Sequence, residues 1–416
     1  MVASARHPPT DFAAEAAQLL LRLGLAIILI VVPAGAIYSR RLLFTLVPVG
    51  VALIVCGALL APGRRSLLPP RHVVFSPVVL ALLFLLAWVG ASLAWTPFKA
   101  LALERYGKTA ATVLLAATAV FVLPARTRTS NLNLMPVGVG IAALATIVAA
   151  LAMPAILLDA PDPEGTAIER AALGLVVLVW PALGALAVRE RWASAGALAV
   201  ATAASATVVW VPAALIAMVV AAFVFSVCTP NPRRMAGVLI FFFCALILLA
   251  PGLALLVQMG LSAGWQPPHG IAVWLQPYLL WADLIREEGP RLFVGHGFDM
   301  TIRALASGYL PAQMPRSILF EIWFDLGIVG ALGLTMLVAL GLRAAGRLPS
   351  PVAPFMLAGI SCIVVVALSG LASMQLWWIT LICVATISFS CVVNGQYRSA
   401  RPAARVVTDG PARPRL

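Results

Sequence analysis

The sequence contains little charge for its length. Only 10% of its 416 residues are charged, 62% are hydrophobic, and the mean hydropathy is +1.03. Soluble domains carry about 25% charged residues, and disordered chains combine high charge with low hydrophobicity, so both classes are excluded. The apolar runs are continuous over about 20 residues, whereas the strands of a membrane β-barrel alternate in shorter segments. We therefore expect an all-α fold, that of a polytopic helical membrane protein.

The sequence also lacks the motifs of soluble enzymes and of nucleic-acid sites. It has no Walker loop, GxSxG, HExxH or GxGxxG motif in the setting that such a site requires, and no basic patch interleaved with aromatic residues. Nucleic acid is therefore not expected as a partner. The polar start Met1–Glu15, followed by a long apolar run, predicts no cleavable signal peptide. Six cysteines without CxxC or metal-ligand spacing are expected to be small packing residues: Cys56, Cys228, Cys244, Cys362, Cys383 and Cys391.

The apolar runs predict twelve membrane spans. The stretch Ser194–Cys228 would be about 52 Å long as a single helix, which exceeds a hydrocarbon core of about 30 Å. We therefore divide it into a hairpin near Trp210–Pro212, where the proline favours a break. The expected spans are 17–38, 42–62, 73–95, 109–125, 133–157, 171–188, 194–209, 211–228, 235–257, 318–342, 351–373 and 376–393.

Acidic residues are also few, and the distribution of charge predicts the orientation. The chain has 28 Lys and Arg against 15 Asp and Glu, a net charge of +13. With both termini cytoplasmic, the inner side holds 18 cations and four acids, and the outer side ten cations and eleven acids. Positive residues concentrate on the cytoplasmic side of membrane proteins, so this orientation is strongly favoured. The predicted order is a cytoplasmic N-terminus 1–16, nine spans over 17–257, an outer loop 258–317, three spans over 318–393, and a disordered cytoplasmic tail 394–416.

The loop 258–317 is the only predicted connection with room for a sizeable site outside the membrane. Within it, Val273–Glu288 has apolar residues at helical spacing and is expected to form an amphipathic helix on the membrane surface, an arrangement compatible with a catalytic loop. The apolar positions are Trp274, Tyr278, Trp281 and Ile285.

Candidate site residues cluster at the outer ends of the spans. Arg170 follows Glu169 where an apolar helix begins. Its guanidinium suits a phosphate, because it binds two oxygens at once and stays charged, although an interfacial arginine paired with Glu169 is an equally good interpretation. Arg303 follows the segment Gly295–Thr301 in the large loop. Its side chain is expected to reach the same cleft as the side chain of His296.

Two further candidates carry acid–base chemistry. His296 lies between two glycines that permit a tight turn, and histidine is the commonest general base at neutral pH, although a lone loop histidine is more often a plain surface residue. Glu321 and Asp325 are four residues apart and share one face of the helix that enters the tenth span. Carboxylates are also favoured there by the helix dipole alone. Gly327 and Gly330 are expected to allow close helix packing.

In the segment Pro315–Gly330 the sequence resembles the O-antigen ligase and polymerase family of bacterial inner-membrane proteins. The family pattern P-H-N-x-F-L-x-x-W-x-E-L-G-x-x-G is matched by Pro315, Trp323, Leu326, Gly327 and Gly330, with Asp325 at the position of Glu. Other matches in the family's order are Trp95-Thr96-Pro97, Ile168-Glu169-Arg170 before Trp180-Pro181, and Gly295-x-Gly297 followed by Arg303.

The sequence departs from the family at the residues next to Pro315. Arg316 stands where the family has histidine, and Ser317 where it has asparagine. The family's arginine before a tryptophan of the surface helix has no counterpart. A general base would therefore come from elsewhere, with His296 and Glu321 as the available choices.

The resemblance implies a metal-independent, inverting glycosyl transfer at the periplasmic face of the bacterial inner membrane, with no cofactor. The donor would be a glycan on undecaprenyl diphosphate, and the acceptor lipid A-core or another glycan, with a ligase preferred over a polymerase. Membrane lipids are the remaining expected partners. Arg170, Arg303 and Arg316 would bind the diphosphate, and His296 or Glu321 would be the catalytic base.

Two alternatives remain. The first is a relative without catalysis that binds lipid-linked glycan, which the missing histidine motivates. The second is an unrelated transporter, which the near absence of charge in the middle of the spans argues against.

Overall fold

The computed structural model describes residues 12–37, 39–61, 71–124, 126–152, 167–268, 271–370 and 375–395. These residues form helices joined by short connections, and the only β-pairing among them is an isolated bridge between Thr127 and Gly395. The first half contains α1 (Phe12–Ala26), η1 (Ile27–Val31), α2 (Val32–Gly35), α3 (Arg40–Leu60), α4 (Arg71–Val74), α5 (Pro77–Ser92), α6 (Lys99–Val122), α7 (Thr129–Leu132), α8 (Leu134–Ala152) and α10 (Ala167–Ala187). The second half contains α11 (Trp192–Val208), α12 (Pro212–Cys228), α13 (Pro232–Ser262), α14 (Ile271–Glu287), α15 (Arg291–Val294), α16 (Met300–Ala306), α17 (Ile318–Ala345), α18 (Ala353–Leu368) and α19 (Leu376–Val393).

The chain is an all-α, polytopic membrane protein, as the composition predicted. The described residues of each expected span are mostly helical, but α6, which overlaps the expected span 109–125, does not qualify as a membrane-crossing helix by length and composition. Within the described residues, seven helices are long and apolar enough to cross a membrane, and four further apolar helices have 10–17 residues. The division near Trp210 is confirmed, because α11 ends at Val208 and α12 begins at Pro212. The predicted tail 394–416 is ordered at its first two residues, and 396–416 lie outside the described residues, as does most of the predicted N-terminal segment 1–16.

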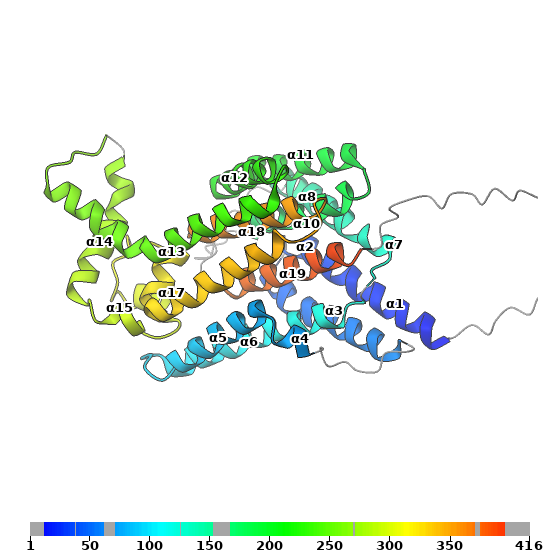
Figure 1. Ribbon diagram of the computed structural model, residues 1–416, viewed down its shortest axis with the longest axis horizontal. Helices are drawn as coiled ribbons and strands as arrows, with labels where there is room; N and C mark the ends of the chain where they lie inside the picture. The colour runs from blue at the N-terminus through cyan, green and yellow to red at the C-terminus, as the bar shows by residue number, and fades with distance from the viewer. Residues whose placement is uncertain are drawn as a thin grey trace, which may run out of the picture.

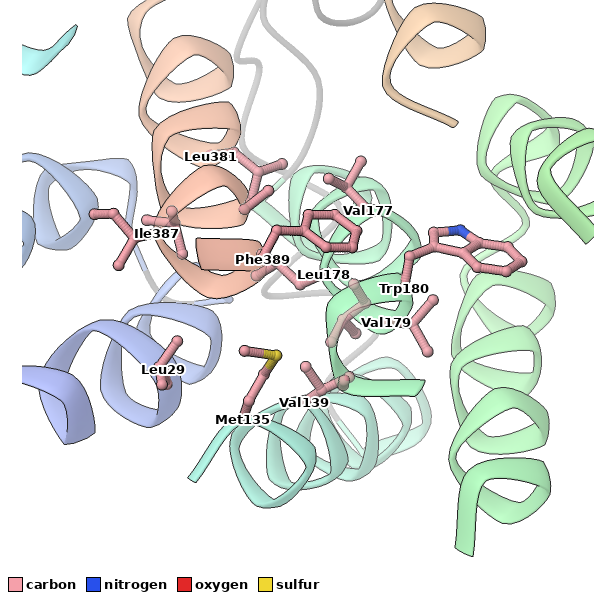
Figure 2. Packing of buried hydrophobic residues seen from close by; sticks show 14 of the residues in the cluster. Leu29, Met135, Val139, Val177, Leu178, Val179, Trp180, Leu381, Ile387 and Phe389 are labelled. Carbon is pink, nitrogen blue, oxygen red and sulfur yellow. The ribbon is translucent and has the colours of Figure 1, made fainter. Parts of the chain in front are cut away.

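Helix α10 forms the centre of the bundle. Every residue from Arg170 to Ala187 is buried, because α8, α11, α12, α18 and α19 surround it. Val177, Leu178, Val179 and Trp180 leave the helix in different directions, so it packs on all sides (Figure 2). Apolar residues on all sides suit a helix that other helices surround. Its first turn carries Arg170, which places this cation at one end of the most enclosed helix.

The bundle has two distinct ends. Helices α14 and α15 lie at one end, which we call the loop end, and the first turn of α1 lies at the other, which we call the terminal end (Figure 1). At the terminal end, Thr127 N donates to Asn394 O at 2.7 Å, and Arg128 Nη1 donates to Gln18 Oε1 at 2.7 Å. The described start of α1 and the end of α19 therefore lie at the same end, as an even number of spans requires.

The predicted amphipathic helix of the large loop is confirmed as α14, but its apolar face packs against protein. Trp281 and Ile285 are buried, and the Trp281 ring meets the Phe320 ring of α17 edge-on at 5.5 Å. Only Tyr278 of this face is exposed among the described side chains. The expected placement on the membrane surface is therefore wrong for the second half of α14, because α17 offers the aromatic surface that buries it.

Helix α17 is broken at Gly327. This residue has φ +65° and ψ −162°, a conformation that only glycine adopts without strain, so Ile318–Leu326 and Ile328–Ala345 are two helical segments with a kink between them. An added Cβ at Gly327 would lie 2.6 Å from Phe293 O and 2.7 Å from Gly295 N. Gly327 thus permits close packing, as predicted, and its partners are the short helix α15 and the residue that follows it in the large loop.

The break leaves backbone carbonyls of α17 without helical partners, and other segments donate to them. Phe324 O accepts from His296 N at 2.8 Å, Asp325 O accepts from Gly297 N at 2.9 Å, and Leu326 O accepts from Trp88 Nε1 at 3.0 Å. An unsatisfied carbonyl inside a membrane protein costs several kcal/mol, so these bonds hold the loop and α5 against the kink.

We predict that Gly327→Ala lowers the free energy of unfolding by at least about 2 kcal/mol, since the new methyl group adds left-handed strain and collides with the backbone of the loop. Gly341→Ala in the same helix is the matched control, because nothing lies within 4 Å of its added Cβ. That change should be neutral or stabilising by up to about 1 kcal/mol. Thermal unfolding in detergent compares the two variants, and equal midpoints would refute the role given to Gly327.

Candidate functional site

The glycines of the segment Gly295–Gly297 are required by their backbone conformation and by close contacts. Gly295 has φ +73° and Gly297 φ +100°. An added Cβ would lie 2.2 Å from Asp325 O at Gly295, and 2.7 Å from Thr96 Cα at Gly297. The loop therefore runs between the kink of α17 and the turn after α5. Three segments that carry the family resemblance, around Thr96, His296 and Asp325, meet at this point.

His296 is held by both of its ring nitrogens. Its Nδ1 lies 3.0 Å from Phe324 O, its Nε2 lies 2.5 Å from Glu288 Oε2, and its ring stacks on the Phe324 ring at 4.0 Å. A carbonyl oxygen only accepts, so Nδ1 donates a proton there. Nε2 faces Glu288 Oε2, so both ring nitrogens are engaged within the protein. In this arrangement His296 secures the loop, and proton abstraction by it would require Glu288 to move away.

Glu288 connects three parts of the large loop. Tyr309 donates its hydroxyl hydrogen to Glu288 Oε1 at 2.7 Å, and His296 binds the other oxygen. Burial alone would raise the pKa of Glu288, but the hydrogen bonds from Tyr309 and His296 outweigh it and hold this pKa below its ordinary value of 4.5. The hydrogen bond to Glu288 in turn raises the pKa of Tyr309. The carboxylate is therefore the ionised centre of this contact at neutral pH.

A second buried carboxylate joins two arginines. Asp299 Oδ1 accepts from Arg105 Nη1 at 2.5 Å, and Asp299 Oδ2 accepts from Arg303 Nε at 3.1 Å. The Asp299 side chain is fully buried, whereas those of Arg105 and Arg303 are 18% and 33% exposed. Glu104 interacts electrostatically with Arg303, and Asp325 with Arg105, so these cations are accompanied by further carboxylates. No described residue accepts a hydrogen bond from Nη1 or Nη2 of Arg303, so both groups are available to a ligand.

Asp325 has a structural partner inside the protein. Its Oδ1 accepts from the backbone N of Thr301 at 2.8 Å and from the Thr301 hydroxyl at 2.7 Å. Thr301 lies on α16, two residues before Arg303. The carboxylate therefore positions the short helix that carries Arg303, which explains an acidic residue at this position beyond the helix dipole.

The remaining predicted residues lie at the same end of the molecule. Arg170 is 7% exposed at the start of α10, and Cys362 Sγ of α18 donates to Val176 O at 3.4 Å. Because the two helices run antiparallel, Arg170 lies near the end of α18. Arg316 is exposed, and its carbonyl would lie 2.8 Å from a Cβ added to Gly370, just after α18. Arg170 and Arg316 therefore both lie near the C-terminal end of α18.

The structure brings the candidate residues together as two groups. His296 contacts the first segment of α17, and the short helix that carries Arg303 is bound to the same segment through Thr301. This segment also carries Glu321, which is only 2% exposed. Arg170 and Arg316 form the second group beside α18. A cavity of about 20 Å³ next to His296 is lined by nine residues, and none of the other four candidates is among them. The segment 159–166 before Arg170, which the sequence also indicated, lies outside the described residues.

Sequence reasoning missed Arg105 and the role of Asp299. Arg105 lies before the expected start of the fourth span at residue 109, but the structure extends α6 back to Lys99 and brings Arg105 to the loop. The ion pair between Asp299 and Arg303 could have been predicted from their spacing, because residues four apart are neighbours on a helix. The partnership with Arg105 spans 194 positions and had no local signal.

The sequence gives no match to models of protein families and none to curated proteins. The family resemblance therefore rests on the motifs alone and remains a prediction. Within the described part of the chain, no group of three or more His, Cys, Asp and Glu side chains is arranged to hold a metal ion.

We predict that Asp299→Asn lowers the free energy of unfolding by about 1–3 kcal/mol, because two partly buried guanidinium groups lose their shared anion. Asparagine tolerates the left-handed backbone of Asp299, whose φ is +68°, so the change tests charge alone. Asp283→Asn at an exposed position of α14 is the control and should have little effect. Equal unfolding midpoints for the two variants would contradict the bridging role.

We predict that the stabilising effect of Glu288 depends on pH. Its pKa is lower in the folded protein, so its contribution is present above pH 4.5 and is lost as the pH falls through the folded value. The midpoint difference between wild type and Glu288→Gln should be largest near neutral pH and should shrink below pH 4.5. Glu287→Gln, at the neighbouring exposed position, should show no such trend. A midpoint difference that is the same at every pH would disprove the charged contact.

Proposed function

We propose that this chain transfers a glycan from undecaprenyl diphosphate to an acceptor sugar at the face of the membrane where the large loop lies. The observation that carries the proposal is the Asp299-bound pair Arg105 and Arg303 at the loop end. Asp299 holds Arg303 through Nε and leaves its terminal nitrogens available. A guanidinium oriented in this way suits a phosphate.

The proposed reaction needs a stabilised leaving group and a base. The acceptor oxygen attacks the anomeric carbon, the bond from that carbon to the phosphate oxygen breaks, and undecaprenyl diphosphate leaves with the bonding electrons. Arg303, with Arg170 and Arg316 from the second group, would stabilise the negative charge that develops on the diphosphate. The base takes the proton of the acceptor hydroxyl. His296 and Glu321 are the two candidates for this base, as in the sequence-based expectation.

The proposed location is the bacterial inner membrane with the loop end in the periplasm. Arginines at the terminal end, among them Arg126, Arg128 and Arg189, support this orientation because positive residues concentrate on the cytoplasmic side. The donor lipid would then meet the loop end directly. A ligase to lipid A-core is preferred over a polymerase, as in the sequence-based expectation.

The break in α17 also bears on the transporter alternative. Transporters use broken helices whose free carbonyls coordinate ions near the middle of the membrane. Here the carbonyls of Phe324, Asp325 and Leu326 accept hydrogen bonds from the protein itself. The break therefore supports the attachment of the loop rather than an ion site.

A second candidate function is binding of lipid-linked glycan without transfer. The engaged nitrogens of His296 and the presence of Arg316 at the family's histidine position favour it, because both reduce the supply of bases. The arginine pair would serve this function equally well. The two functions differ only in whether the bond to the diphosphate is cleaved.

We predict that Arg170→Ala and Arg303→Ala each abolish glycan transfer while the amount of protein in the membrane stays unchanged, because the diphosphate leaving group loses a fixed cation. Arg286→Ala, at an exposed position of α14, is the control and should retain transfer. The measurement is the lipopolysaccharide ladder of a deletion strain that carries each variant.

The outcomes separate the candidates. A ladder restored by wild type and by Arg286→Ala alone supports the transferase. Full activity of Arg170→Ala and Arg303→Ala would refute the roles of these arginines. If wild type restores no ladder but purified protein retains lipid-linked glycan that both variants lose, the binding function is correct.

A further inference from the structure

The terminal end contains a cavity of about 520 Å³ that the proposed function does not use. It lies between α1, the end of α3, the end of α6 and α7. Helix α6 separates it from the candidate site, because Arg105 lies near the start of this helix and Val122 at its end. Arg105 precedes Val122 by about 17 residues of this helix, so the two places are about 25 Å apart along its axis.

The cavity exists because small residues line α1 and α3. Ala14 and Ala17 of α1 face Gly57 and Ala58 of α3, and these side chains cannot fill the space beside them. A Cβ added to Gly57 would lie 2.8 Å from Ala17 O, so the two backbones are already in contact. The hollow on the side of α6 therefore cannot close by moving α1 closer to α3.

Three arginines line this cavity against one acidic residue, Glu15. They are Arg22 on α1 and Arg126 and Arg128 in the turn between α6 and α7. Arg128 Nη1 donates to Gln18 Oε1 at 2.7 Å, which fixes this guanidinium across the mouth. Asn131 adds an amide and is 7% exposed. The lining thus combines positive charge with neutral donors, which is the chemistry that binds a phosphate.

The surroundings of Arg22 connect the cavity to the lipid. Arg22 lies in a candidate membrane span, among leucines of which Leu19 and Leu23 are 59% and 46% exposed on the outside of the bundle. Leu19 also lines the cavity. An ionisable residue within a span is costly unless it serves a partner, and basic pockets between spans bind anionic head groups.

We infer that this cavity is a binding site for a phosphate-bearing anion, and that its occupant is the head group of an anionic phospholipid whose acyl chains lie along Leu19 and Leu23. The small residues provide the volume, the three arginines bind the phosphate, and the exposed leucines contact the chains. The site is separate from the proposed glycan transfer and does not depend on it.

The test measures thermal unfolding of the purified full chain in neutral detergent with three probes: phosphatidylglycerol, phosphatidylcholine and inorganic phosphate. Arg126→Gln/Arg128→Gln removes two cations of the cavity. Arg233→Gln/Arg234→Gln is the matched control, because it removes the same charge at the start of α13, outside the cavity lining. Arg22→Gln tests the cation within the span.

Phosphatidylglycerol is expected to raise the unfolding midpoint of wild type and control, and phosphatidylcholine to do so much less. The apparent affinity for phosphatidylglycerol should fall at least about tenfold in Arg126→Gln/Arg128→Gln. Stabilisation by inorganic phosphate that this variant loses supports the phosphate site and identifies a soluble anion as a sufficient ligand. Equal affinity in the cavity variant and the control, or no preference for phosphatidylglycerol over phosphatidylcholine together with no effect of phosphate, would overturn the proposal.

Discussion

The rest of this structure depends on the hydrogen bonds that satisfy the broken backbone of α17. A helix inside a membrane protein cannot leave carbonyl groups without donors, because the surrounding lipid offers none. The break at Gly327 therefore requires donors from elsewhere, and the backbone of His296 and Gly297 and the indole of Trp88 provide them. This requirement fixes the large loop to the bundle at one place. It also explains why glycines occur on both sides of the contact, since any side chain there would separate the two backbones.

The charged residues of the loop follow from that attachment. Once the loop lies against α17, Thr301 reaches Asp325, and Asp299 lies between Arg105 and Arg303. Asp325 and Asp299 thereby each receive two donors, as burial of charge demands. The arrangement places Arg105 and Arg303 on the two oxygens of Asp299 and leaves the terminal nitrogens of Arg303 without a described acceptor. The proposed diphosphate chemistry and the structural bonds of the loop thus use the same residues, and Asp299 serves both by orienting Arg303.

The candidate site was predictable only in part. The sequence indicated Arg303, His296 and Asp325 individually, because each follows a local pattern of glycines or helical spacing. Their partners were not predictable. Glu288 lies eight residues from His296 across a turn, and Arg105 lies on a helix almost two hundred residues from Asp299. The assignment of His296 as a base came from its residue type, whereas the contacts of its ring nitrogens are with Phe324 and Glu288, which only the folded chain brings to it.

Composition and hydropathy by themselves determined that this protein is a polytopic helical membrane protein, because the length of an apolar run is a local property of the sequence. The tertiary structure alone decided which helix lies at the centre, where α17 breaks, that α14 buries Trp281 against Phe320, and which charges meet. These features arise from packing and hydrogen bonding between distant segments. A local sequence pattern does not identify partners in distant segments. These partners are defined only in the folded chain, where buried backbone groups must form hydrogen bonds and buried charges must be paired.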